Sequence, residues 1–109
     1  MAETAHEHAG KPVMETVTFK LNEGTSRDEF AEAARGMNDW VAAQPGFVRR
    51  RLSCTEDGTW VEQIEWASMD DAKAAAAKIG REPGNAPFLT AIDGPSAKLM
   101  HSAVEVAIN

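Results

Sequence analysis

The sequence predicts an α+β domain in which an antiparallel four-stranded sheet carries helices on one face. Its 109 residues suit one domain rather than two. Segments that alternate between apolar and polar residues, as half-buried strands do, occur near both ends and in the middle of the chain. Between them lie segments with helical periodicity and capping residues. The predicted order is strand, helix, strand, strand, helix, short helical piece, strand.

The first strand is predicted within residues 12–21, PVMETVTFKL. A period of two and several β-branched residues indicate a strand with one buried face. That face carries Val13, Glu15, Val17, Phe19 and Leu21.

The first helix is predicted from Ser26 to the Pro45-Gly46 pair. Ser26 and Glu29 form a capping box, in which each side chain accepts a hydrogen bond from an otherwise free backbone N–H group. The apolar stripe consists of Phe30, Ala33, Ala34, Met37 and Val41, with Trp40 at its edge.

The next two strands form a hairpin around TEDGT, residues 55–59. A three-residue loop with Gly58 in the left-handed conformation places Thr55 opposite Thr59. One face then carries Val48, Arg50, Leu52, Cys54, Trp60, Glu62, Ile64 and Trp66, and the other carries Phe47, Arg49, Arg51, Ser53, Val61, Gln63, Glu65 and Ala67. A two-residue Asp-Gly loop would shift the pairing by one residue and separate apolar from polar side chains less cleanly.

Strand alternation also divides the arginine triplet of residues 49–51 between the two faces. Arg49 is predicted opposite Glu65 and Arg51 opposite Gln63, whereas Arg50 lies on the more apolar face. The triplet is therefore no single basic patch, and the net charge of −6 repels polyanions. We expect no binding to nucleic acid or to an anionic membrane.

The second helix is predicted from an N-cap at Ser68 to Gly80, with Asp70 and Asp71 in its first turn. A short helical piece is expected at residues 87–92. The last strand is predicted within residues 96–108, with apolar side chains at Leu99, Met100, Val104, Val106 and Ile108.

Residues 1–11 are predicted to be a flexible N-terminal tail, and residues 12–109 the single folded domain. His6 and His8 in this tail are more typical of a solvated segment than of a metal site, and no zinc spacing or phosphate loop occurs. No metal or cofactor is therefore predicted. The single cysteine, the absence of a secretory signal and the absence of a long apolar segment favour the cytoplasm.

Two βαβ-like halves with both helices on the same face make a ferredoxin-like sandwich. The uncovered face is predicted to mix polar with apolar side chains, the latter from Met14, Phe47 and Val61. Such a face is too apolar to be left in water. We therefore expect a homodimer.

Three segments in this order resemble the antibiotic biosynthesis monooxygenase-like domains of the dimeric α+β barrel superfamily. They are QPGF before the second strand, EDGTWVEQIEWAS leading into an alanine-rich helix, and APFLTAI before the last strand. The resemblance covers residues 12–108. It implies that two open sheet faces close a barrel around a cavity, and that the protein is a small cofactor-independent monooxygenase acting on an aromatic or quinone-like molecule.

Such chemistry needs a base near a phenol and polar groups that hold the resulting anion. The candidate catalytic residues are His101 and Glu65, and the candidate substrate-binding residues are Arg49, Arg51, Gln63, Trp60 and Trp66. Each has a structural alternative, such as an Arg49–Glu65 ion pair or a core position for Trp66.

Haem degradation, which also occurs in this superfamily, is disfavoured. Thr16 and Thr18 occupy the strand face that should carry an asparagine, and no histidine lies between Trp66 and Gly80. The alternative function is a non-catalytic dimer that binds a small molecule or serves as a structural module.

Overall fold

The computed structural model describes residues 10–109. Residues 1–9 of the predicted tail, with His6 and His8, lie outside this range. Lys11, at the end of the predicted tail, forms an ion pair with Glu105 at 2.9 Å.

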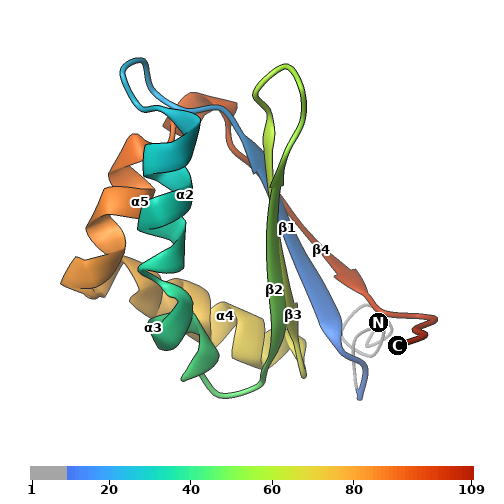
Figure 1. Cartoon of the computed structure of the whole chain (residues 1–109). Coiled ribbons are helices and arrows are strands. Elements are labelled where there is room, and N and C mark those ends of the chain that lie inside the picture. Colours follow the sequence, from blue (N-terminus) through green and yellow to red (C-terminus); the bar gives the residue numbers. More distant parts are fainter. Residues whose placement is uncertain (1–9) are drawn as a thin grey trace.

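The chain forms a four-stranded antiparallel sheet with all of its longer helices on one face (Figure 1). The elements are β1 (Val13–Phe19), α2 (Arg27–Arg35), α3 (Asn38–Ala42), β2 (Phe47–Cys54), β3 (Trp60–Trp66), α4 (Met69–Lys78), α5 (Ala86–Ala91) and β4 (Lys98–Ala103). Short 3₁₀ turns occupy Ile79–Arg81, Pro83–Asn85 and Gly94–Ser96. The strand order β2-β3-β1-β4 is that of a ferredoxin-like sandwich, which confirms the predicted fold class.

The predicted hairpin register is correct from Arg49 to the turn. Thr55 and Thr59 face each other, and the Thr55 N–H group donates to the Thr59 carbonyl at 2.8 Å. Gly58 has φ of 86°, the left-handed conformation that the three-residue loop requires. Arg49 pairs with Glu65 and Arg51 with Gln63, as expected.

The start of the hairpin was predicted wrongly. A register shift between Phe47 and Arg49 pairs Phe47 with Trp66 instead of Ala67. A bulge inserts one extra residue and changes which face the strand end presents. The Phe47 ring packs edge-to-face on the Trp66 ring at 6.1 Å and so joins the helix-side core instead of the open face.

The first helix is broken, whereas the sequence predicted one helix within residues 26–45. Gly36, a poor helix former, separates α2 from α3. The Met37 N–H group bonds to the Ala34 carbonyl three residues back at 3.1 Å, a tighter turn than the α-helix makes. The Arg50 guanidinium also donates to this carbonyl, at 2.8 Å.

The last strand is shorter than the predicted range of 96–108. β4 ends at Ala103, and the last backbone hydrogen bond to the neighbouring chain segment joins Val104 N–H to Pro12 C=O at 2.8 Å. Residues 104–109 leave the sheet on the side away from the helices (Figure 1). Val106 and Ile108 are 89% and 96% exposed, because β1 supplies no further partner beyond Val13.

The core lies between the sheet and the helices and is rich in aromatic rings. The Phe30 ring stacks on Phe88 at 4.8 Å and meets Trp60 edge-to-face at 4.8 Å. Phe19 contacts Phe30 and Phe88 in the same edge-to-face manner. This packing fixes the distance between the helical layer and the strands. It therefore also sets how much space remains for polar side chains between the two layers.

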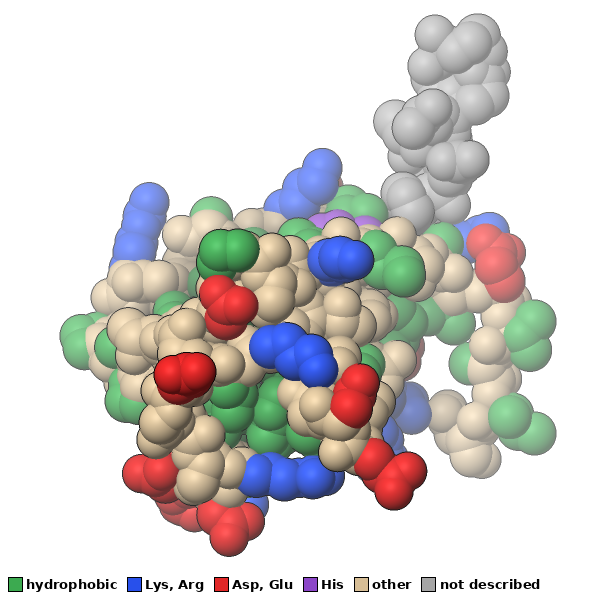
Figure 2. Space-filling model, turned by 90° about the horizontal axis from the view of Figure 1, so that it is seen from above, with side chains coloured by type: hydrophobic (Ala, Val, Ile, Leu, Met, Phe, Trp, Pro, Cys, Tyr) green, Lys and Arg blue, Asp and Glu red, His purple; other side chains and the backbone are tan. Residues whose placement is uncertain are grey.

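Two surface properties bear on partners. No helix within residues 10–109 is both long enough and apolar enough to span a membrane. Seen from above, acidic and basic side chains are interspersed, and no broad basic field gathers on that face (Figure 2).

Candidate functional site between the sheet and the helices

Two charged side chains are buried under the helices. Arg50 on β2 and Glu62 on β3 form an ion pair at 2.8 Å, and each side chain is only 8% exposed. Arg50 Nε and Nη2 both donate to the Glu62 carboxylate. Burial raises the pKa of Glu62 above its ordinary value, Arg50 opposes this rise, and the negative charge of Glu15 adds to it.

Arg50 also holds the junction between α2 and α3. Its Nη1 donates to the Ala34 carbonyl at 2.8 Å and to Asn38 Oδ1 at 3.0 Å. Its guanidinium lies 5.5 Å from the centre of the Phe88 ring. Arg50 therefore connects β2, β3, both helices of the broken segment and α5, which explains why a charge is tolerated there.

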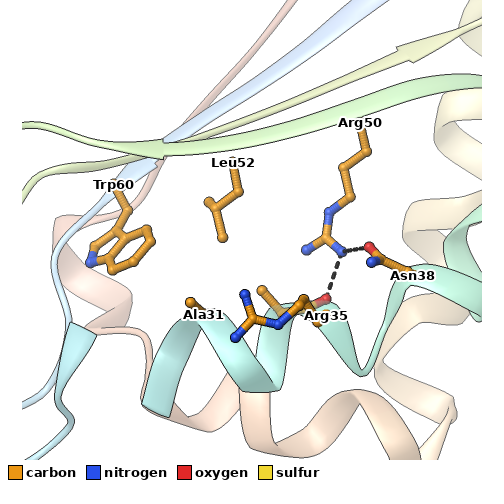
Figure 3. A pocket seen from close by; sticks show the side chains of 7 residues that line it. Ala31, Arg35, Asn38, Arg50, Leu52 and Trp60 are labelled. Atoms are coloured by element: carbon orange, nitrogen blue, oxygen red, sulfur yellow. Dashed lines mark hydrogen bonds between the residues drawn. The ribbon is translucent and has the colours of Figure 1, made fainter. Parts of the chain in front are cut away.

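A hollow of about 190 Å³ opens beside Arg50 (Figure 3). We call it the arginine hollow. It is lined by Ala31, Ala34, Arg35, Asn38, Arg50, Leu52 and Trp60. In Figure 3 Arg50 and Leu52 descend from the strand toward α2, while Ala31 and Arg35 rise from the helix.

A second, smaller hollow of about 80 Å³ lies under α3 and α4. We call it the glutamate hollow. It is lined by Glu15, Trp40, Val41, Ile64, Trp66, Ala75, Ala76 and Ile79. Among the described residues that line it, Glu15 is the only ionisable one. Trp66 Nε1 donates to Glu15 Oε1 at 2.8 Å, which fixes the carboxylate and leaves Oε2 available to another donor.

His101 belongs to the same face as Glu15. The two residues are directly opposite each other on β4 and β1. His101 Nε2 is buried and has no hydrogen-bond partner within residues 10–109. Facing side chains on adjacent strands lie about 5 Å apart at Cβ, so the imidazole is a neighbour of the glutamate hollow.

The remaining predicted site residues lie on the open face. Glu65 forms the predicted ion pair with Arg49 at 3.2 Å, and Arg49 Nη2 also donates to Asn109 Oδ1 at 3.2 Å. Arg51 faces Gln63 across the same strands.

The structure therefore divides the candidate residues into two sets. His101, Trp60 and Trp66 face the helices, whereas the other four face away. The two candidate catalytic groups, His101 and Glu65, stand on opposite sides of the sheet and cannot act on one bound molecule within a single chain.

Sequence reasoning did not select Glu15, Glu62 or Asn38. The sequence does contain a signal for Glu15 and Glu62. In each case, the alternation of the strand places a carboxylate on the face that otherwise carries apolar side chains. Asn38 had none, since its role depends on the helix break. Within residues 10–109 no group of three or more His, Cys, Asp or Glu side chains is placed to hold a metal ion.

The strand order and the single helical layer define the class of protein as a ferredoxin-like α+β domain. No family model matches the sequence, and neither does any curated protein. Solved structures with the same fold include proteins described as putative antibiotic biosynthesis monooxygenases and as a cofactor-independent oxygenase.

One is a point mutant of SnoaB, a cofactor-independent oxygenase from Streptomyces nogalater. It is 20% identical, with a TM-score of 0.72 over 90% of this chain and 97% of that chain. Another is the ActVA-Orf6 monooxygenase of Streptomyces coelicolor in complex with nanaomycin D. It is 19% identical, with a TM-score of 0.68 over 91% of this chain and 92% of that chain. At these identities the likeness establishes the fold.

Proposed function

We propose that the protein is a cofactor-independent monooxygenase whose substrate is a hydroxylated aromatic molecule, a phenol or quinol. The observation that carries this proposal is Glu15, a carboxylate held by the Trp66 indole N–H with its second oxygen free in a hollow between two indole rings. A carboxylate so placed accepts a proton from a phenol, and the indoles provide walls for an aromatic ring.

The reaction uses dioxygen as co-substrate. Glu15 takes the phenolic proton, and the electron-rich ring then bonds to dioxygen at carbon. The proton returns to the outer oxygen of the resulting peroxide. Loss of the ring C–H proton and cleavage of the O–O bond release water. The sum is one hydroxylated ring and one dioxygen giving one quinone and one water.

The size of the glutamate hollow sets how the substrate binds. Its volume of about 80 Å³ is near half of the roughly 150 Å³ cavity that holds benzene. The hollow therefore takes the hydroxyl-bearing edge of a ring, and the rest of the molecule lies along Trp40 toward solvent. Trp40 is only partly buried and belongs to the five-residue helix α3, so it is the wall best able to adjust.

The fold supports the proposal by analogy. SnoaB is a cofactor-independent oxygenase, and ActVA-Orf6 is a monooxygenase that binds nanaomycin D.

The test is oxygen uptake in the presence of a series of phenols, naphthols and quinols, with binding measured separately by tryptophan fluorescence. Glu15→Gln should lower the rate at least about a hundredfold, the scale of a lost general base, while the variant stays folded. Trp66→Phe keeps a ring but loses the N–H donor, and should lower the rate less.

Arg51→Gln is the matched comparison, because it alters the substrate site that the sequence predicted on the open face of the sheet. If Arg51→Gln rather than Glu15→Gln abolishes turnover, the substrate lies on the open face. Binding of these aromatics without any oxygen uptake would instead support the non-catalytic binding module.

A further inference from the structure

The arginine hollow contains hydrogen-bond donors that the fold leaves unused. Four of the five Arg50 N–H groups are engaged, by Glu62, Ala34 and Asn38, which leaves one on Nη2. The Asn38 side chain uses its oxygen for Arg50, so its amide NH₂ remains a donor beside the hollow. Figure 3 shows both groups at one end of the hollow.

Within residues 10–109 the lining supplies no group that could accept a proton from a ligand. The guanidinium groups of Arg35 and Arg50 carry N–H donors and no acceptor, and Asn38 Oδ1 already accepts from Arg50. The remaining lining residues are aliphatic, apart from the Trp60 ring. A ligand bound here must therefore bring the acceptor atoms itself, and the hollow is a binding site without acid–base chemistry.

The charge around the hollow favours an anion. Arg35 lines it, and its ion pair with Glu32 at 2.8 Å is formed by side chains that are 62% and 76% exposed. Such a surface pair is worth little and exchanges easily for another carboxylate. Glu62, the ion-pair partner of Arg50, is not among the residues that line the hollow. A carboxylate matches the planar fork of a guanidinium.

The shape limits the rest of the ligand. The volume of about 190 Å³ exceeds the roughly 150 Å³ that holds benzene but is below the range for drug-sized molecules. Trp60 and Leu52 form apolar walls at the end away from Asn38 (Figure 3). By volume, the hollow has room for one ring beside these walls.

We propose that the arginine hollow is a second binding site, separate from the glutamate hollow, that takes a carboxylate carried on a single ring. The carboxylate is held by Arg35, the free Arg50 N–H and the Asn38 amide, and the ring lies against Trp60 and Leu52. This site is independent of the oxygenase proposal, since no residue lines both hollows.

The experiment is a titration of the full-length protein with benzoate, followed by backbone amide shifts in NMR spectra and by calorimetry. Benzamide has the same ring and nearly the same shape without the charge. We expect benzoate to bind at millimolar or lower concentration, with the largest shifts at Ala31 and Asn38, and benzamide to bind at least about tenfold more weakly.

Two variants and one control locate the site. Arg35→Gln should weaken benzoate at least about fivefold, whereas Arg81→Gln, which removes an exposed arginine outside both hollows, should not. Ala31→Phe should fill the hollow and abolish binding with the fold intact. Equal binding of benzamide, equal effects of the two arginine variants, or no shifts at Ala31 and Asn38 would each overturn the proposal.

Discussion

The guanidinium of Arg50 and the carboxylate of Glu62 meet at 2.8 Å beneath the helices, with each side chain 8% exposed. The pair crosses from β2 to β3, and Arg50 extends it to the break between α2 and α3. Its energetics and its pH dependence are therefore the most direct tests of the structure.

Replacing one partner of this pair should be costly. Arg50→Met leaves Glu62 buried without a counter-charge and should lower the free energy of unfolding by about 3–5 kcal/mol. The double variant Arg50→Met/Glu62→Leu removes both charges and should regain most of that loss, because apolar residues of similar size fill the same space. Urea unfolding of the wild type and the variants gives the double-mutant cycle. A mild loss in Arg50→Met would mean that water reaches Glu62.

Glu62 should also make stability depend on pH. Burial raises the pKa of Glu62 above its ordinary value of 4.5, so the folded protein holds this proton more tightly than the unfolded chain. The stability that this proton contributes is fully present below pH 4.5 and is lost as the pH rises through the folded-state pKa.

The control is Glu62→Gln, which cannot titrate at this position. The wild type should lose stability relative to this variant as the pH rises above 4.5. Below pH 4.5 the two plots of stability against pH should run parallel. Urea unfolding at a series of pH values measures both curves. Curves that stay parallel throughout would show that the pKa of Glu62 is not raised.

Two glycines with positive φ should respond differently to alanine. Gly58 has φ of 86° and open space around it, so Gly58→Ala should cost about 1 kcal/mol from the backbone alone. Gly46 has φ of 82°, and an added Cβ there would overlap the Asp71 side chain. Gly46→Ala should therefore lower the thermal midpoint clearly more than Gly58→Ala. Equal losses would contradict the close approach of α4 to the start of β2.

The open face of the sheet is predicted to pair with a second copy of the chain. Met100 and Leu99 are adjacent on β4 and similarly exposed, at 60% and 57%, but only Met100 shares the open face with Thr16. Met100→Glu should convert a dimer into a folded monomer in sedimentation velocity experiments, and Leu99→Glu should not. A wild-type protein that sediments as a monomer at micromolar concentration would disprove the dimer.

Local signals in the sequence were sufficient to predict most of the helices and strands and the register of the β2–β3 hairpin. The capping box at Ser26 is present in the structure, and Ser68 caps α4 as predicted. Alternation separated Arg50 from Arg49 and Arg51, and the Asp57-Gly58 turn aligned the hairpin. These features depend on residues a few positions apart, so the sequence carries them directly.

The arrangement of the buried charges depends on contacts between distant segments. The helix break depends partly on the Arg50 guanidinium reaching Ala34, and the bulge at Phe47 accompanies the packing of its ring on Trp66. Glu15 meets Trp66 only because β1 pairs with β3.

Alternation along each strand was thus enough to assign most side chains to a face of the sheet. Which of these side chains touch was set by the packing of segments far apart in the chain, because a strand's alternation defines its faces but leaves its partners and its end point open.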